Sequence, residues 1–145
     1  MRTTDWVHDK RAFALPTEFS TRFEQFLNGL PWLGSALDWS KMPSAQVINL
    51  ASADANDLHI WLSKTRIGAH SHIAIWYSAE RGGLVVPLEI GVTNLDELYR
   101  EAPGVRFAFG VDLREGQLEP AYGALLQYGS GDDLIAVGIE MNRSQ

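Results

Sequence analysis

The residues best suited to chemistry gather between positions 59 and 76, which hold three of the four histidines. If 58–63 and 70–77 form the two strands of a hairpin with 64–69 as its loop, alternation brings five side chains to one face. They are His59, Trp61, His70, His72 and Trp76. Histidines two apart on a strand project to the same side, which is a spacing that suits zinc.

This histidine and tryptophan face is open to three interpretations. A zinc site needs a third ligand, and no short motif supplies one, although Asp57 or His59 could be recruited. A half-buried polar sheet face and an exposed binding face are the other two. We expect no metal here, since no third ligand is visible and metal-bound histidines are usually oriented by carboxylates.

Other catalytic patterns are missing from the sequence. No Gly-x-Ser-x-Gly elbow occurs, and the acidic pair after Gly129-Ser130-Gly131 favours a hairpin turn over a phosphate-binding nest. The glycine patterns of nucleotide-binding loops are absent, and zero cysteines exclude a thiol nucleophile. Carboxylates are numerous, but no two can be placed across a cleft. We therefore expect no cofactor and favour a binding protein over an enzyme.

The charges of the chain are unevenly distributed. Residues 1–72 carry seven basic and seven acidic side chains, whereas 73–145 carry five basic and eleven acidic ones. The net charge of −6 therefore lies in the second half. Such a field repels nucleic acids and anionic membranes, which we exclude as partners, and favours basic proteins. Ordinary solubility is the simpler explanation of the same charge.

We predict two alternative partner-binding surfaces. One is the acidic set that lies in or beside turns, namely Asp112, Glu115, Glu119, Asp132 and Asp133. The other is the strand face that carries Trp61, His72 and Trp76. We favour the acidic turns, because a sheet face with two tryptophans more often belongs to the core.

Two segments have helical periodicity. In 17–28 the apolar residues recur every three or four positions, and Asn28-Gly29 predicts a left-handed stop. In 94–102, Asn94 and Glu97 have the spacing of a capping box. The side chains that we expect to pack on a sheet are Phe19, Phe23, Phe26, Leu95 and Leu98.

Most remaining segments alternate or are rich in β-branched and aromatic residues, which predicts strands. They are 47–50, 58–62, 72–77, 84–90, 105–111, 122–128 and 134–141. Pro87 cannot donate to a sheet, so its strand should lie at an edge or bulge there. Because short turns join most segments, we predict an α+β fold with a largely antiparallel sheet of six to seven strands and two main helices.

Length and composition predict a single domain over residues 1–145. A chain of 145 residues that is 46% hydrophobic can enclose a core, and no repeat or linker divides it. The lack of cysteine excludes disulfides, and no apolar run is long enough to span a bilayer or resembles a signal peptide. We expect a soluble cytoplasmic protein.

Two motifs resemble those of a known family. The segment Leu15-Pro16-Thr17-Glu18-Phe19, followed by Phe26-Leu27-Asn28-Gly29, is similar to the opening helix of bacterial immunity proteins of the SUKH type. The helix predicted from Asn94, after a hairpin, also resembles a helix of these proteins. The motifs cover a small part of the chain, and the segments 32–44 and beyond Val105 do not match them.

A small acidic, cysteine-free α+β protein is also similar to immunity proteins of polymorphic and contact-dependent toxin systems. This resemblance implies a bacterial protein that binds a cognate toxin, such as a basic nuclease, and neutralises it by occlusion. Small acidic secretion chaperones are a second similar class, although the predicted strand at 134–141 replaces their usual C-terminal helix. The third alternative is a metal-dependent hydrolase that uses His70 and His72.

Overall fold

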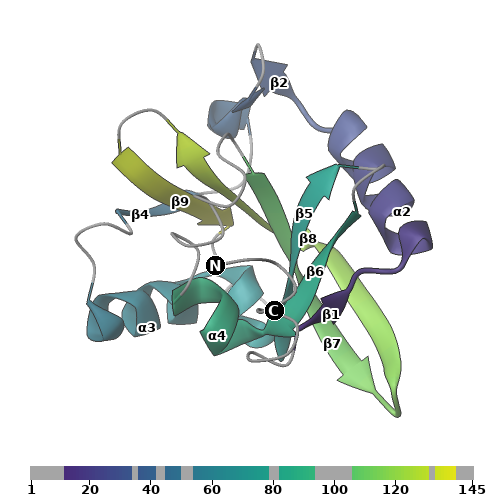
Figure 1. Ribbon diagram of the computed structural model, residues 1–145. Coiled ribbons are helices and arrows are strands. Elements are labelled where there is room, and N and C mark those ends of the chain that lie inside the picture. The colour runs from purple at the N-terminus through teal and green to yellow at the C-terminus, as the bar shows by residue number, and fades with distance from the viewer. Residues whose placement is uncertain are drawn as a thin grey trace, which may run out of the picture.

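The computed structural model describes residues 12–33, 36–41, 45–49, 54–78, 82–93, 106–130 and 133–139. Within this part of the chain seven strands form one sheet in the order β1-β6-β5-β7-β8-β9-β4, and all neighbouring pairs are antiparallel. Figure 1 shows the strands with the helices α2, α3 and α4 around them. The predicted α+β class with an antiparallel sheet is confirmed.

The strands of the sheet are β1 (Phe13–Ala14), β4 (Ala45–Asn49), β5 (His72–Ser78), β6 (Gly82–Pro87), β7 (Arg106–Arg114), β8 (Gln117–Ser130) and β9 (Asp133–Ile139). The helices are α2 (Thr17–Asn28), α3 (Ala55–Lys64) and α4 (Leu88–Thr93), with 3₁₀-helices η1 (Trp39–Lys41) and η2 (Arg66–Ala69). A separate two-stranded hairpin consists of β2 (Trp32–Leu33) and β3 (Ala36–Leu37).

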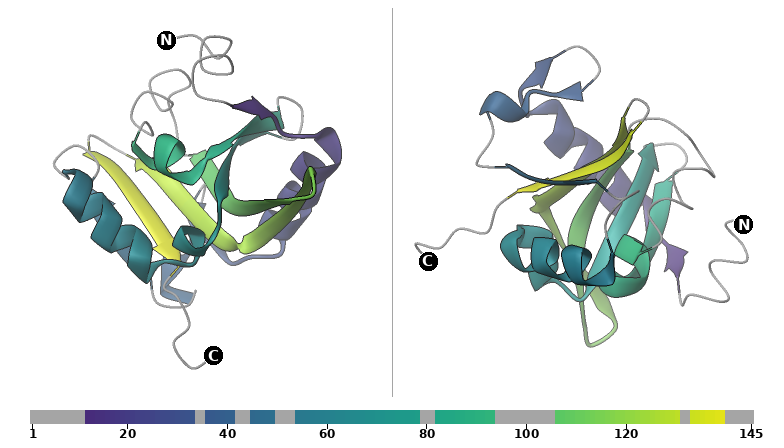
Figure 2. Two further views of the ribbon diagram at one scale, coloured as in Figure 1. Left: turned by 90° about the horizontal axis from the view of Figure 1, so that it is seen from below. Right: turned by 90° about the vertical axis from the view of Figure 1, so that its left-hand side faces the viewer.

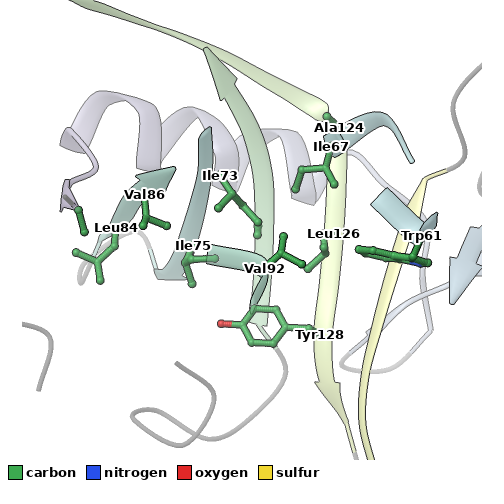
Figure 3. Close-up of a cluster of buried hydrophobic side chains, with 12 residues drawn as sticks. Trp61, Ile67, Ile73, Ile75, Leu84, Val86, Val92, Ala124, Leu126 and Tyr128 are labelled. Atoms are coloured by element: carbon green, nitrogen blue, oxygen red, sulfur yellow. The ribbon is translucent and has the colours of Figure 1, made fainter. Parts of the chain in front are cut away.

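One face of the sheet is closed by α3, η2 and α4. Ile73 and Ile75 of β5 point to this face and are fully buried. Figure 3 shows them in a cluster that also contains Trp61 of α3, Ile67 of η2 and Val92 of α4. The views in Figure 2 place α3 and α4 on the same side of the strands. Burial of large apolar side chains contributes roughly 1.5–3 kcal/mol each, so this cluster is a major source of stability.

The opposite face is closed by α2. The ring of Phe23 lies 4.4 Å from that of Phe109 in β7 and 5.3 Å from that of Trp76 in β5, measured between centroids. The indole nitrogen of Trp76 donates a 2.8 Å hydrogen bond to Oγ of Ser20, and this hydroxyl donates to the carbonyl of Ser78. Aromatic packing and two hydrogen bonds therefore fix α2 on the sheet.

The predicted bounds of α2 are confirmed, but its end differs from the prediction. Gly29 has φ −86° and ψ −3°, which is right-handed, so the predicted left-handed stop is wrong. The backbone N–H of Gly29 donates to the carbonyl of Phe26 at 3.1 Å, which tightens the last turn. The chain then reaches Pro31, which cannot continue a helix.

The strand predicted at 58–62 is wrong, because this segment belongs to α3. Asp54 and Asp57 form a capping box: the N–H of Asp57 donates to Oδ1 of Asp54 at 2.8 Å, and the reverse bond is 3.1 Å long. Leu58, Trp61 and Leu62 have helical spacing and pack toward the core. The cap and this stripe outweigh the preference of β-branched and aromatic residues for strands.

A bulge between β7 and β8 reverses the alternation of β8. Phe109 pairs with Leu125, whereas the next residue, Gly110, pairs with Ala121, so three residues of β8 are extra. Tyr122, before the shift, therefore joins the cluster under α2, whereas Leu126, after it, joins the cluster under α3. An odd number of extra residues moves side chains to the other face, as a register slip does.

The helix predicted at 94–102, including Leu95 and Leu98, lies outside the described residues. The strand predicted at 84–90 ends at Pro87 and continues as α4. Among the described residues β1 pairs with 84 and 85 of β6 and no strand pairs with the outer side of Pro87, as expected for a residue that cannot donate. Among the described residues, no helix has the length and apolar character needed to cross a membrane.

The contact of Phe23 with the sheet predicts a large loss of stability when its ring is removed. Phe23 is fully buried, so Phe23→Ala should lower the free energy of unfolding by about 3–5 kcal/mol in urea titrations. Phe26→Ala, at a half-buried position of the same helix, is the matched control and should cost less than half as much. Equal effects of the two variants would contradict the central place of Phe23.

Candidate functional site

The hairpin of β7 and β8 ends in a two-residue turn. Glu115 has φ 51° and Gly116 has φ 79°, and two positive φ values in succession define a type I′ turn. Among the described residues Glu115 is the one non-glycine with positive φ. A non-glycine residue in this conformation costs about 1–2 kcal/mol, so the tip keeps a carboxylate at the expense of stability.

The two strands of this hairpin have different faces. Leu113 and Leu118 pair directly across the strands on one face. Asp112 pairs with Glu119 on the other face, where Nε of Arg114 binds a carboxylate oxygen of Glu119 at 3.0 Å. The hairpin is therefore amphipathic: Asp112 and Glu119 share its polar face, and Glu115 lies at the turn.

An open groove of about 610 Å³ lies along the apolar face of the hairpin. It is bounded by the hairpin on one side and by β1 and the start of α2 on the other. The residues that line it are Phe13, Pro16, Glu18, Phe19, Leu113, Gly116, Gln117 and Leu118. Leu113 is 38% exposed, which places it among the exposed large hydrophobic residues of the described chain. We call this groove together with Glu115 the tip-groove surface.

Glu18 is the charged residue in the wall of the groove. Neither Glu18 nor Glu115 forms an ion pair with another described residue, and both are exposed. Glu18 occupies the first turn of α2, where the helix dipole favours a negative charge. The tip-groove surface thus combines an apolar floor with two carboxylates that can accept a cation from outside the chain.

The carboxylate of Asp112 forms hydrogen bonds within the fold. Its Oδ2 accepts from Nδ1 of His70 at 2.9 Å, and its Oδ1 accepts from the backbone N–H of Ser71 at 2.9 Å. These bonds, first that of the Ser71 N–H and then that of His70, lower the pKa of Asp112 below its ordinary value of 3.8. The imidazole lies against Gly110, where any Cβ would approach ring atoms to 2.4 Å. Asp112 therefore ties the start of β5 to β7.

The tryptophans of the predicted strand face belong to the interior. Trp61 is 5% exposed, and its indole nitrogen donates to the carbonyl of Gln46 at 3.0 Å. Trp76 is half-buried against Phe23. His72 is half-buried in β5, with Nδ1 at 2.8 Å from Oγ of Ser71. The hairpin that would have placed these side chains on one face with His59 does not form, because 58–63 is helical.

The acidic set predicted from the sequence is divided in the structure. Glu115 lies at the tip of the hairpin. Glu119 lies nearby, on the face opposite that of Leu113 and Leu118. Asp133 begins β9 and pairs with Ser130 at the far end of β8. At about 3.3 Å per residue that strand of 14 residues spans up to roughly 40 Å. Asp132 lies outside the described residues.

The zinc arrangement considered from the sequence does not form. His59 is exposed on α3 and not on a strand beside His70 and His72, and His70 lies before β5, where its Nδ1 bonds to Asp112. The described residues contain no group of three or more His, Cys, Asp or Glu side chains arranged to hold a metal ion. The geometry on which a His-x-His hydrolase would depend is therefore missing from this part of the chain.

Sequence reasoning did not find the groove. Phe13, Leu113 and Leu118 were not assigned to a surface, and Phe19 was expected to pack on the sheet but also lines the groove. A usable signal was present in the segment 113–118, where Glu115-Gly116 separates two leucines at the spacing of a two-residue hairpin. The approach of β1 and α2 to this hairpin depends on tertiary packing and has no local signal.

No family model matches the chain, and no curated protein or solved structure matches it. The resemblance to immunity proteins therefore still depends on the motifs themselves. The first of these, 15–29, spans α2 and the residues that lead into it. The second, from Asn94, lies outside the described residues.

The turn geometry makes a prediction about stability. Glu115→Asn should raise the free energy of unfolding by about 1 kcal/mol, because Asn tolerates the left-handed conformation better than Glu does. Gly116→Ala should lower it by about 1 kcal/mol for conformational reasons alone, since no atom lies within 4 Å of the added Cβ. Glu24→Asn, within α2, is the control and should be slightly destabilising. A destabilised Glu115→Asn would contradict the type I′ turn.

The bonds to Asp112 predict a pH dependence. Because its pKa is lowered in the folded state, ionised Asp112 stabilises the fold above pH 3.8, and this contribution disappears as pH falls through the lower folded value. Asp112→Asn should therefore be less stable than the wild type at neutral pH, and the difference should shrink below roughly pH 4. Glu119→Gln, at the paired exposed position, is the matched control. A pH-independent difference for Asp112→Asn would refute this role.

Proposed function

We propose that this chain is a binding protein that neutralises a basic toxin protein by occlusion, and that the tip-groove surface is where it binds. The observation that carries the proposal is an open apolar groove with Glu18 in its wall and Glu115 at the adjoining turn, two carboxylates that form no ion pair with another described residue. Interfaces commonly combine an apolar centre with a polar rim in this way. An apolar side chain of the partner would enter the groove, and Lys or Arg beside it would meet the carboxylates.

The shape of the groove favours a protein over a small molecule. Small-molecule sites of similar volume usually enclose most of their ligand, whereas this groove of about 610 Å³ is open along the hairpin. An open apolar channel fits side chains that are presented by a larger surface. The groove is also preformed, since paired strands hold one wall and a packed helix the other, and this lowers the ordering cost of association.

The charge of the chain supports a basic partner. The net charge is −6, and the excess of acidic residues lies in the second half, which includes the hairpin. Toxins that cleave nucleic acids carry basic surfaces because their substrate is a polyanion. An acidic inhibitor is attracted to such a surface over a distance, which raises the association rate at low salt. Covering that surface would block the substrate.

The groove also fits the second function considered from the sequence, that of a secretion chaperone. Its apolar residues, Phe13, Phe19, Leu113 and Leu118, could hold an apolar segment of an unfolded effector. The two functions differ in the state of the partner: an immunity protein binds a folded toxin and abolishes its activity, whereas a chaperone binds an unfolded segment. We favour immunity because the unpaired carboxylates suit a basic folded surface.

The experiment that tests the proposal uses the protein encoded by the adjacent gene as partner. A one-to-one mixture should abolish its toxic activity, and surface plasmon resonance should separate the two contributions to binding. Glu115→Lys should lower the association rate constant about tenfold at low salt and reduce its salt dependence. Leu113→Ala, in the groove wall, should mainly raise the dissociation rate constant, also by about tenfold.

Glu119→Lys is the matched control for this experiment. It makes the same change of charge on the other face of the same hairpin, so its effect on association should be clearly smaller than that of Glu115→Lys. A larger effect of Glu119→Lys would place the interface on the opposite face. Unchanged rates for Glu115→Lys and Leu113→Ala, with full binding retained, would overturn the tip-groove surface.

A further inference from the structure

We infer that Arg66 and the bulge of β8 form a second ligand site, which binds the phosphate group of a small anion. The site lies on the α3 side of the sheet, where η2 packs on β8, and it is separate from the tip-groove surface. Three observations carry the inference: a guanidinium without a partner, an open position beside it, and neighbouring carboxylates that are bonded elsewhere.

The first observation is the unpaired side chain of Arg66. This residue begins η2 and is half-buried. Its guanidinium forms no ion pair or hydrogen bond with another described residue. Because a guanidinium has five N–H donors, and burial removes part of the water that would satisfy them, buried arginines are usually paired. Within the described chain, Arg66 therefore lacks the acceptor that its position calls for.

The second observation is an open position next to this guanidinium. Gly123 lies in the bulge of β8, and a Cβ added there would meet one atom within 4 Å beyond its chain neighbours, Nη1 of Arg66 at 4.0 Å. Figure 3 shows Ile67 of η2 beside Ala124, with which it shares a buried cluster, so η2 packs on β8 next to Gly123. The position above Gly123 is thus open and bordered by a cation.

The third observation concerns the acids on the same face of the hairpin. Asp112 accepts two hydrogen bonds within the fold, and Glu119 binds Nε of Arg114 at 3.0 Å. Neither carboxylate forms an ion pair with Arg66. Arg66 is therefore left as the cation on this face that can take an anion from outside the chain.

A phosphate group fits the donors at this place. A guanidinium bonds two oxygens of a phosphate or a carboxylate in parallel. Residues 122–124 have no register partner in the described parts of β7 and β9, and a bulge leaves its extra residues outside the ladder. Backbone donors therefore lie at the floor of the site, where the further oxygens of a phosphate can accept from them. A carboxylate uses both of its oxygens on the guanidinium.

The charge of the whole chain restricts the ligand to a small one. The net charge is −6, which repels long polyanions such as nucleic acids. A single phosphate group experiences mainly the charges within about 8–10 Å at physiological salt, and Arg66 is among the nearest of these. The ligand class is therefore inorganic phosphate or a small phosphate monoester.

Titration of the full chain with inorganic phosphate, followed by amide chemical shifts in NMR spectra, tests the site. Saturable shifts should appear at 66 and 122–124 at millimolar phosphate, and sodium chloride at equal ionic strength should not produce them. Arg66→Gln should weaken binding about tenfold, because the paired donors are lost. Gly123→Val should weaken it as strongly without a change of charge, because its side chain fills the open position. Arg22→Gln, on α2, is the matched control and should bind as the wild type does.

A second titration with adenosine monophosphate distinguishes the two sources of the phosphate group. Tighter binding than that of inorganic phosphate, lost in Arg66→Gln, assigns the site to a phosphate monoester, whereas affinity no greater than that of inorganic phosphate assigns it to free phosphate. The absence of saturable shifts at 122–124 with both probes would overturn the inference. Equal phosphate binding by the wild type, Arg66→Gln and Gly123→Val would also overturn it, provided that circular dichroism shows each variant to be folded.

Discussion

Strand β7 is paired on both edges and buried on both faces, and the position of almost every other element follows from this constraint. Its Ala108 faces the cluster under α3, whereas Phe109 faces Phe23 of α2. A strand buried on both sides needs a cover on each, which explains why helices lie on both faces of a sheet whose pairing is entirely antiparallel. The far end of β7 extends beyond this core as the hairpin that carries the candidate site.

The bulge between β7 and β8 connects the core to the site. The shift after Phe109 allows Leu118 and Tyr122 to face the same side as α2, although Leu126 farther along β8 faces the other side. The apolar wall of the groove therefore lies beside the start of α2, while Asp112 on the other face binds His70 and Ser71. The face of β7 that carries Asp112 thus contributes to stability, and the face that carries Leu113 is left open for binding.

Sequence reasoning predicted those parts of the fold in which local and tertiary preferences agree. The segment 17–28 has a clear helical stripe and is α2, and the alternating segments after 105 are β7, β8 and β9. It failed at α3, where aromatic and β-branched residues suggest a strand, whereas the capping box of Asp54 and Asp57 begins a helix. That error displaced His59 and Trp61 and placed five histidine and tryptophan side chains on a common face that does not form. The groove could not be predicted, since its two walls meet only after α2 has packed on the sheet.

Amide hydrogen exchange of the chain alone and in complex with the protein encoded by the adjacent gene tests the central claim most directly. The tip-groove surface predicts new protection in 13–19 and 113–118, the two segments that line the groove, with little change on the exposed side of α3. Protection confined to other segments, with these two exchanging as fast as in the free chain, would contradict the assignment of this surface.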